Sequence, residues 1–399
     1  MKSNLRHLRT FLSAVETGSI TRAAELNNVS QPAVTQAIRK LEHAYGMPLF
    51  QRTARGLFTS EAGQILARRV RRALDRLDRV LTGLSSRLSL TATTSQLTAL
   101  IAAVDAQNFS LAARRLSLAQ PTVHRAIAEL ELECGKALFE RTSGGMIATR
   151  AAIGLAQAAE LAFSELAQAE AELGALFGRE VGEIVVGAMP LSRATILPAA
   201  IARFREQFPT LPIKAVEGPY CDLLTGLLRG KIDLLIGALR YPAPVDDLEQ
   251  ELLFEDGLSV VCGPNHPMRS DREPTLGELA RYPWVVSAIG TPSRAVFDRI
   301  FCEGNAPPSL VETSSVMLMR ELLAVSDHLG FVSSGQIISD VRLGSLVELP
   351  AALPQTTRAI GIGTRKGWEP TRAQSHFLDA IRHASAQLHS NATQSERAG

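Results

Sequence analysis

The feature that most constrains this chain is a pattern of residues that occurs twice in its N-terminal part. Each copy has an Ala-Ala pair, a Gln-Pro dipeptide that opens a run with helical spacing, a Leu-Glu pair, and a closing Gly-x-x-Leu-Phe-x-Arg-Thr segment. The first copy has Ala23-Ala24, Gln31-Pro32, Leu41-Glu42 and residues 46–53, and the second has Ala112-Ala113, Gln120-Pro121, Leu130-Glu131 and residues 135–142. A repeat with matching glycine, proline and core positions indicates a duplicated structural unit.

Spacing within the first copy predicts three helices followed by a two-stranded wing. Residues 5–17 have apolar side chains at helical intervals, and Gly18 ends that helix. Ser19 and Ser30 are suited to cap the next two helices, and Pro32 lies in the first turn of the third, where proline is tolerated. Residues 50–59 have the alternation of a two-stranded wing. A helix-turn-helix of this kind places a short helix in the major groove, so the chain is predicted to read DNA.

A long amphipathic helix is predicted after each copy. Both helices have apolar residues at alternating four- and three-residue steps, which form a heptad seam that needs a partner. The first seam is Leu66, Val70, Ala73, Leu77, Val80 and Leu84, and the second is Leu155, Ala159, Ala162, Leu166, Ala169, Leu173 and Leu176. One such helix is compatible with ordinary packing, but two in these positions favour helix-mediated dimerisation.

From residue 181 onward the pattern changes to alternating strands and helices. Strands are predicted at residues 183–187, 211–217, 232–237, 252–261, 284–287, 330–333 and 359–363, and helices at 196–208 and 223–229. This alternation predicts mainly parallel sheets, with ligand sites at the strand ends.

The formal net charge of +2 hides an uneven distribution. Residues 1–90 carry about +9, residues 91–178 about −3 and the remainder about −4, so the N-terminal end is the one expected to approach phosphates. No apolar run reaches the roughly 18 residues that span a bilayer, and no signal peptide is evident, which predicts a cytoplasmic protein. The four cysteines are scattered without a Cys-x-x-Cys pair, so we expect reduced packing residues and no metal or cofactor site.

The first copy resembles the winged helix-turn-helix of LysR-type transcriptional regulators. The residues that match are Phe11, Gly18-Ser19, Ala23-Ala24, Val29-Ser30-Gln31-Pro32-Ala33-Val34, Ile38, Leu41-Glu42, Gly46, Pro48-Leu49-Phe50, Arg52-Thr53 and Thr59-Ser60-Glu61-Ala62-Gly63. Asn27 departs from the pattern, since the family usually has leucine there. Residues 181–390 resemble the family's effector domain, which has the fold of periplasmic binding proteins; the segments at 230–237, 266–267 and 328–332 occur in the right order.

The second copy is the main departure from the family, because ordinary members have one winged unit and one linker helix. The chain is therefore expected to be multidomain, with two all-α winged helix-turn-helix units in tandem, long linker helices and an α/β periplasmic-binding-protein-like effector domain. The expected boundaries are 1–63 for the DNA-binding unit, 64–90 for its linker helix, 91–150 for a degenerate second unit, 151–178 for a second linker helix, 179–390 for a two-subdomain effector domain and 391–399 for a disordered tail.

Candidate DNA contacts lie on the third helix of the first copy and on its wing. Glutamine reads adenine and arginine reads guanine through paired hydrogen bonds, and a helix N-terminus suits a phosphate. The candidates are Ser30, Gln31, Pro32, Thr35, Gln36, Arg39, Arg52 and Arg55, with the two last expected at backbone or minor groove.

In the second copy, acids replace residues that would face DNA: Lys40 and Gln51 correspond to Glu129 and Glu140. Such acids oppose phosphates, which favours a structural or dimerisation unit over a second reader of an extended operator. A second reader stays possible because polar candidates are retained: Gln120, Thr122, His124, Arg125 and Arg141.

A small effector is expected in the cleft between the two subdomains, near strand ends and helix N-termini. The candidates are Leu191, Ser192, Pro219, Tyr220, Thr291, Ser293, Phe331 and Ser333. A helix starting near Arg193 would direct free N–H groups at this cleft, and Arg193 and Arg294 would favour an anionic ligand if they point into it.

The resemblance thus implies a sequence-specific transcriptional regulator that binds double-stranded DNA as a homodimer or homotetramer and responds to a small effector. The histidines are dispersed and no Gly-x-Ser-x-Gly or phosphate-binding loop is present, so no catalytic residues are assigned. The alternative is a cytoplasmic small-molecule-binding protein whose helix-turn-helix units serve only oligomerisation; an enzyme and a purely structural oligomer are the other rivals.

Overall fold

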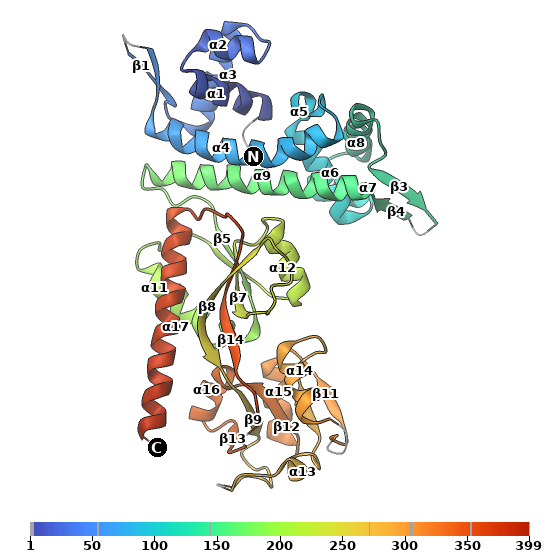
Figure 1. Ribbon diagram of the computed structural model, residues 1–399, viewed down its shortest axis with the longest axis vertical. Helices are drawn as coiled ribbons and strands as arrows, with labels where there is room; N and C mark the ends of the chain where they lie inside the picture. The colour runs from blue at the N-terminus through green and yellow to red at the C-terminus, as the bar shows by residue number, and fades with distance from the viewer. Residues whose placement is uncertain are drawn as a thin grey trace. The chain divides into compact units, whose positions relative to one another are not determined.

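The computed structural model describes residues 4–53, 56–143, 145–270, 272–302, 306–351 and 353–398 (Figure 1). It divides into two compact units. Unit 1 comprises Met1–Glu183 and Arg229–Lys231, and unit 2 comprises Ile184–Leu228 and Ile232–Gly399.

Unit 1 contains both copies of the repeat. The first copy consists of α1 (Leu5–Thr17), α2 (Ile20–Leu26), α3 (Gln31–Tyr45), β1 (Phe50–Thr53), β2 (Gly56–Thr59) and α4 (Glu61–Leu84). The second consists of α6 (Thr94–Ala106), α7 (Phe109–Leu116), α8 (Gln120–Cys134), β3 (Phe139–Thr142), β4 (Gly145–Ala148) and α9 (Arg150–Ala175). Every element of the second copy begins 89 residues after its counterpart. The loop expected between the copies contains a one-turn helix, α5 (Leu88–Thr91).

The predicted helix boundaries of the first copy are confirmed by their capping groups. Gly18 and Gly46 end α1 and α3 with φ of 60° and 73°, a left-handed conformation that glycine adopts without strain. The hydroxyls of Ser19 and Ser30 accept hydrogen bonds from N–H groups in the first turns of α2 and α3.

The repeated Leu-Glu pair shapes the turn before each wing. The Glu42 carboxylate accepts a hydrogen bond from the Leu49 N–H at 2.9 Å, and the Glu131 carboxylate accepts one from the Leu138 N–H at 2.7 Å. The leucines of the pair, Leu41 and Leu130, are buried. The same core contact and the same backbone anchor are therefore built twice.

The long helices α4 and α9 lie side by side in unit 1 (Figure 1). They are antiparallel, since Arg69 near the start of α4 contacts Glu172 near the end of α9. The seam residues Leu66 and Leu77 of α4 and Leu155 and Leu166 of α9 are at most 1% exposed within one chain. The predicted seams are confirmed, and they pack against each other within one chain, so neither seam needs a second copy in order to be buried.

Unit 2 contains two mixed five-stranded sheets. The first has the order β6-β5-β7-β14-β8 and the second β11-β10-β12-β9-β13. The strands of the first are β5 (Ile184–Ala188), β6 (Ile213–Val216), β7 (Leu234–Ala238), β8 (Leu248–Asp256) and β14 (Arg358–Arg365). Those of the second are β9 (Leu258–Cys262), β10 (Trp284–Val286), β11 (Leu310–Glu312), β12 (Leu329–Ser333) and β13 (Val347–Leu349).

Helices flank both sheets. They are α10 (Pro190–Ala194), α11 (Ile196–Arg205), α12 (Tyr220–Leu228), α13 (Leu276–Leu279), α14 (Pro292–Ile300), α15 (Val316–Val325), α16 (Ser334–Arg342) and α17 (Arg372–Ala398). Buried side chains such as Phe204, Ile236 and Phe377 form the core of the first subdomain, and Trp284, Phe297 and Phe331 form that of the second.

Several expectations for this part are corrected. The sheets are not mainly parallel, because β5 and β10 each have two parallel neighbours while β14 and β9 pair antiparallel on both sides. The strand expected over residues 252–261 is two strands, β8 and β9, in different sheets. The tail expected to be disordered from residue 391 continues α17 to Ala398.

Among the described residues, no helix has the length and apolar character of a membrane span. The same residues contain no group of three His, Cys, Asp or Glu side chains placed to hold a metal ion.

Candidate functional site

The first recognition helix, α3, has one apolar and one polar face. Val34, Ile38 and Leu41 are buried, as expected from helical spacing. On the opposite side Gln36 and Arg39 are exposed. Gln31 and Pro32 lie exposed in the first turn, directly after the capping residue Ser30, while Thr35 is half-buried. The face predicted to read DNA is therefore presented to solvent.

Positive charge on this face is not neutralised locally. Arg39 and the neighbouring Lys40 form no ion pair with any residue that the structure describes. Arg22 on α2 is likewise exposed and unpaired within that part of the chain. Unpaired cations on an exposed helix are suited to contact phosphates. Arg52 lies on β1 of the wing, and Arg55 lies outside the described residues.

The second recognition helix, α8, has the same framework but a different surface. Gln120, Thr122 and Arg125 are exposed, and Ala128 stands at the position of Arg39. Ala119 precedes the helix without a side-chain cap, where the first copy has Ser30. Glu129, at the position of Lys40, accepts a hydrogen bond from the Gln96 amide at 2.9 Å.

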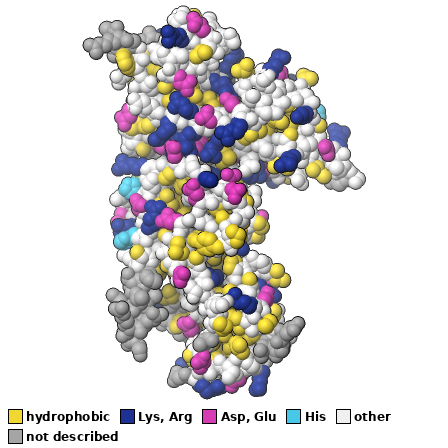
Figure 2. Space-filling model, viewed as in Figure 1, with side chains coloured by type: hydrophobic (Ala, Val, Ile, Leu, Met, Phe, Trp, Pro, Cys, Tyr) yellow, Lys and Arg dark blue, Asp and Glu magenta, His cyan; other side chains and the backbone are white. Residues whose placement is uncertain are grey.

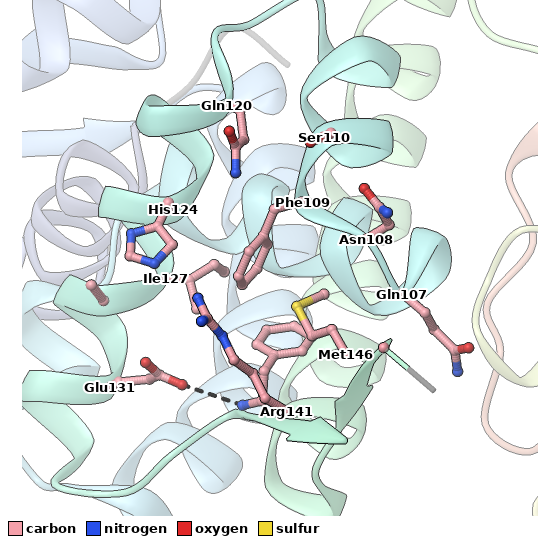
Figure 3. Close-up of a pocket in the computed structure, with 13 residues that line it drawn as sticks. Gln107, Asn108, Phe109, Ser110, Gln120, His124, Ile127, Glu131, Arg141 and Met146 are labelled. Carbon is pink, nitrogen blue, oxygen red and sulfur yellow. Dashed lines mark hydrogen bonds between the residues drawn. The ribbon is translucent and has the colours of Figure 1, made fainter. Parts of the chain in front are cut away.

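Aromatic side chains fill the space between α8 and its wing. The ring centroids of Phe109 and His124 are 5.6 Å apart, and those of Phe109 and Phe139 are 5.4 Å apart, both edge to face. A hollow of about 420 Å³ opens between α7, α8 and the wing. Figure 3 shows Phe109, His124 and Arg141 converging on it. This unit thus has a hollow lined by polar and aromatic side chains, which includes His124 and Ala128 at the positions of Thr35 and Arg39.

The hydroxyl groups expected to face an effector are engaged within unit 2. Ser192 is fully buried and donates to the Met189 carbonyl at 2.7 Å, and Ser333 donates to Asp256 at 2.7 Å. Thr291 caps α14 and donates to the Ala288 carbonyl at 2.7 Å. Ser293 donates to the Ser287 hydroxyl at 3.1 Å. These side chains therefore stabilise loops and helix ends of unit 2.

The remaining expected cleft residues divide into core and surface. Leu191 and Phe331 are buried in the cores of the two subdomains, Pro219 is exposed, and Tyr220 is half-buried at the start of α12. The helix expected to start near Arg193 begins instead at Pro190.

The two arginines considered for an anionic ligand are paired with acids. Arg193 forms an ion pair with Glu217. Arg294 contacts Asp298 at 2.7 Å and Glu312 at 3.0 Å. Their charges are therefore already compensated.

Arg240, which the sequence patterns did not single out, connects the two subdomains of unit 2. Its guanidinium lies 4.1 Å from the centre of the Tyr220 ring, and Nη1 is 3.5 Å from the Gly290 carbonyl in the other subdomain. The side-chain amide of Gln250 accepts a hydrogen bond from the Arg240 N–H and donates one to the Arg240 carbonyl. Its Nε is buried and has no hydrogen-bond partner among the described residues. Burial raises the pKa of Tyr220 despite the nearby charge of Arg240, so the phenol stays protonated at neutral pH.

The two strands that cross between the subdomains are tied by one carboxylate. Asp256, at the end of β8, accepts hydrogen bonds from the Ser333 hydroxyl, from the Gly335 N–H at 3.1 Å and from Arg358 at 2.7 Å. Arg358 is the first residue of β14, and Ser333 is the last residue of β12. Asp256 therefore connects the end of β8 with the start of β14 and the end of β12.

Comparisons with known protein families match both parts of the chain. Residues 177–386 match the LysR substrate binding domain. Residues 5–64 and, separately, residues 94–153 match the bacterial regulatory helix-turn-helix of the lysR family.

Two curated relatives align with nearly the whole chain. The transcriptional regulator GalR of Pseudomonas putida is 35% identical over 384 residues, which cover 95% of this chain and 96% of GalR. PcaQ of Agrobacterium fabrum is 25% identical over 391 residues, which cover 98% of this chain and 97% of PcaQ.

Among solved structures, full-length OxyR from Pseudomonas aeruginosa has a TM-score of 0.53 at 22% identity, covering 72% of this chain and 94% of OxyR. CbnR, a LysR family transcriptional regulator, has a TM-score of 0.51 at 20% identity, covering 73% of this chain and 99% of CbnR. These similarities support the fold of a winged helix-turn-helix joined to an α/β domain.

Proposed function

The chain belongs to the LysR family of bacterial transcriptional regulators, and from this premise we propose how its two winged units divide the reading of DNA. It is a DNA-binding regulator with an effector-binding domain, not an enzyme, and regulators of this family bind DNA and effectors as oligomers. We propose that the first winged unit reads the operator sequence and that the second contributes little discrimination between bases.

The first unit's role is supported by the exposed, unpaired polar face of α3. Gln31, Gln36 and Arg39 have side chains that pair with base edges, while Thr35 adds a hydroxyl near the same face. Ser30 caps α3 and Pro32 lies in its first turn, and we expect the N–H groups at this N-terminus to contact a phosphate. Arg52 and Arg55 are proposed to contact the backbone or the minor groove from the wing.

The second unit's lesser role is carried by one observation: Ala128 and Glu129 occupy the positions of Arg39 and Lys40 on α8. At these two positions two cations are lost and an acid is gained, which outweighs the one cation gained where Arg125 replaces Gln36 and weakens attraction to phosphates. His124 is also in contact with Phe109, which restricts its reach. The rival role, a second reader of an extended operator, is favoured by the exposed Gln120, Thr122 and Arg125 and by Arg141 on the wing.

Matched double variants test this division. Each bidentate base contact provides about 1–3 kcal/mol of discrimination, so Gln36→Ala with Arg39→Ala is expected to lower operator affinity by about tenfold or more. His124→Ala with Arg125→Ala is expected to lower it far less. Mobility-shift titrations of the full chain on a native operator, at one salt concentration, measure both. Equal losses from the two pairs would establish the second unit as a reader.

For the effector, we propose a small ligand with one or two acidic groups that binds beside Arg240 in the cleft. Support comes from the buried Nε of Arg240, which lacks a partner among the described residues, and from the Tyr220 ring stacked on the same guanidinium. An arginine fork of this kind binds a carboxylate through charge-assisted hydrogen bonds. Ser192, Thr291 and Ser293 then act by positioning the surrounding backbone.

Once thermal-shift screening has identified an effector, Arg240→Ala should weaken its binding by roughly 10- to 150-fold, since a hydrogen bond to a charged group contributes about 1.5–3 kcal/mol. Calorimetry on the full chain measures the affinity. Arg294→Ala, at a cation already paired with Asp298 and Glu312, is the matched control. Unchanged affinity in Arg240→Ala would place the ligand elsewhere.

A further inference from the structure

The paired helices α4 and α9 carry opposite charges beside their seams. Between residues 68 and 79, α4 has six arginines and two aspartates. In α9 the acids are Glu160, Glu165, Glu170 and Glu172, and the only basic residue is Arg150 at its first position. Figure 2 shows basic and acidic side chains gathered over the region of these helices.

One buried arginine is at the centre of this contact. Arg69 is 0% exposed, and its guanidinium donates to Glu165 at 2.9 Å and to Gln168 at 2.6 Å, as well as to Glu172. Arg72 donates to the other oxygen of Glu165 at 3.0 Å. At the edge of the contact, Arg68 pairs with the second oxygen of Glu172. All the acceptors belong to α9 and all the donors to α4.

The two helices occupy equivalent places in the repeat, yet their charged positions have diverged. With the 89-residue offset, Arg69 corresponds to Ala158, and Glu165 corresponds to Arg76. If two α4 helices paired in the same antiparallel manner, arginines would face arginines, whereas in a pair of α9 helices Glu165 would face Ala158 and would have no cationic partner there. Like charges brought together in a contact cost free energy, and such repulsion selects one partner against others.

Burial of the charges strengthens this selection. A buried ion pair adds little net stability, because desolvation offsets the attraction, but removing one partner leaves an uncompensated charge. Arg69 would be such a charge if α4 packed against a helix that lacks Glu165 and Glu172. The seam leucines provide the stability of the pair, and the charges determine which helix can be the partner.

We propose that α4 and α9 form a charge-selected pair within one chain. The linker-helix surface is thereby closed to a second copy, and the two winged units of one chain form a single asymmetric pair. Arg69 and Arg72 on α4, with Glu165 and Glu172 on α9, determine this choice of partner. Association between chains must use a surface other than these two seams.

Cross-linking of the full chain tests whether the pair forms within one molecule. Arg68→Cys and Glu172→Cys place thiols across the contact, in a chain whose exposed Cys221 and Cys302 are changed to serine. A short bismaleimide should join them into a product of monomer mass on a denaturing gel. The variant with Arg68→Cys alone is the control and should give no product. A dimer-mass product from the two-cysteine chain would overturn the proposal.

Charge reversal tests the selection itself. Arg69→Glu with Arg72→Glu, or Glu165→Arg with Glu172→Arg, should each lower the melting temperature of unit 1, and all four changes in one chain should restore it. Co-expressing the two double variants should give a 1:1 heterodimer by light scattering, since each supplies the helix that complements the other. The proposal fails if both double variants keep the wild-type melting temperature, or if the fourfold variant is no more stable than they are. These readouts do not involve DNA, so they are independent of which winged unit reads the operator.

Discussion

At the scale of single residues, Glu42 and Glu131 show what the duplication has kept. Each carboxylate anchors the backbone N–H of the leucine before a wing, at 2.9 Å and 2.7 Å. A hydrogen bond to a charged group contributes about 1.5–3 kcal/mol, so Glu42→Ala and Glu131→Ala should each destabilise their own wing by that amount. Hydrogen exchange of the Leu49 and Leu138 amides measures the local opening. Gln variants, which keep an acceptor, serve as controls and should exchange more slowly than the Ala variants. No acceleration at Leu138 in Glu131→Ala would show that the second copy does not depend on this anchor.

The exposed face of α3 was predictable from the sequence, whereas the contacts between the subdomains of unit 2 were not. Helical periodicity alone determines that Val34 and Ile38 point inward and that Gln36 and Arg39 point outward. A serine near a helix start gives no such signal, because its hydroxyl also satisfies local backbone groups, as Ser192 does. Arg240 was missed because its neighbour Gly290 is 50 residues away in the sequence. The only local signal was a cation soon after the apolar strand β7.

At the scale of secondary-structure elements, the α4–α9 pair should respond to acid through Glu165. Burial raises the pKa of Glu165, but hydrogen bonds from Arg72 and Arg69 outweigh burial, so its pKa is lowered from the ordinary value of 4.5. A carboxyl group with a lowered folded-state pKa stabilises the fold above its unfolded-state pKa, and this stabilisation is lost as the pH falls through the folded-state pKa. Unit 1 should therefore lose stability below about pH 4.5.

Melting temperatures of the full chain between pH 3.5 and 7 measure this dependence. Glu165→Gln should lower the melting temperature at pH 7 and flatten the decline toward acid. Glu170→Gln, on the same helix at a position without an ion pair among the described residues, is the control and should leave the curve unchanged. A curve for Glu165→Gln that runs parallel to wild type would contradict the assignment.

The same elements show why a pattern gives a helix but not its partner. The heptad spacing of residues 66–84 predicted a buried seam correctly, but spacing says nothing about whether the second helix comes from the same chain. That information lies in the charges of Arg69 and Glu165, which become complementary only when the helices are antiparallel. Similarly, the apolar run from Leu252 to Val261 predicts one strand, although the chain passes from one sheet to the other at Gly257.

At the scale of the whole molecule, the charges of the sequence have two different uses. Residues 1–90 carry about +9, but several of the arginines of α4 are paired with acids of α9. The cations left exposed and unpaired in the described part of the first winged unit include Arg22, Arg39 and Lys40. The recognition helices differ in charge, since α3 keeps Arg39 and Lys40 where α8 has Ala128 and Glu129, while much of the positive charge of α4 is paired with acids of α9.

This difference between the two winged units predicts that base-pair substitutions have different costs in different parts of the operator. Under the first winged unit, each mismatched base pair should cost about 1–3 kcal/mol, because Gln36 and Arg39 are free to contact base edges. Under the second unit, where Ala128 and Glu129 replace Arg39 and Lys40, base-pair substitutions should have little effect, although the DNA backbone can still be protected from cleavage.

Nuclease footprinting on a native operator defines the protected segments. Competition binding with single base-pair substitutions across these segments measures the cost at each position, at fixed salt because affinity depends on ionic strength. The control is the His124→Ala, Arg125→Ala variant, whose position-by-position profile should match that of the wild type. A profile with two equally sensitive half-sites per chain, one of which disappears in that variant, would show instead that both winged units read sequence.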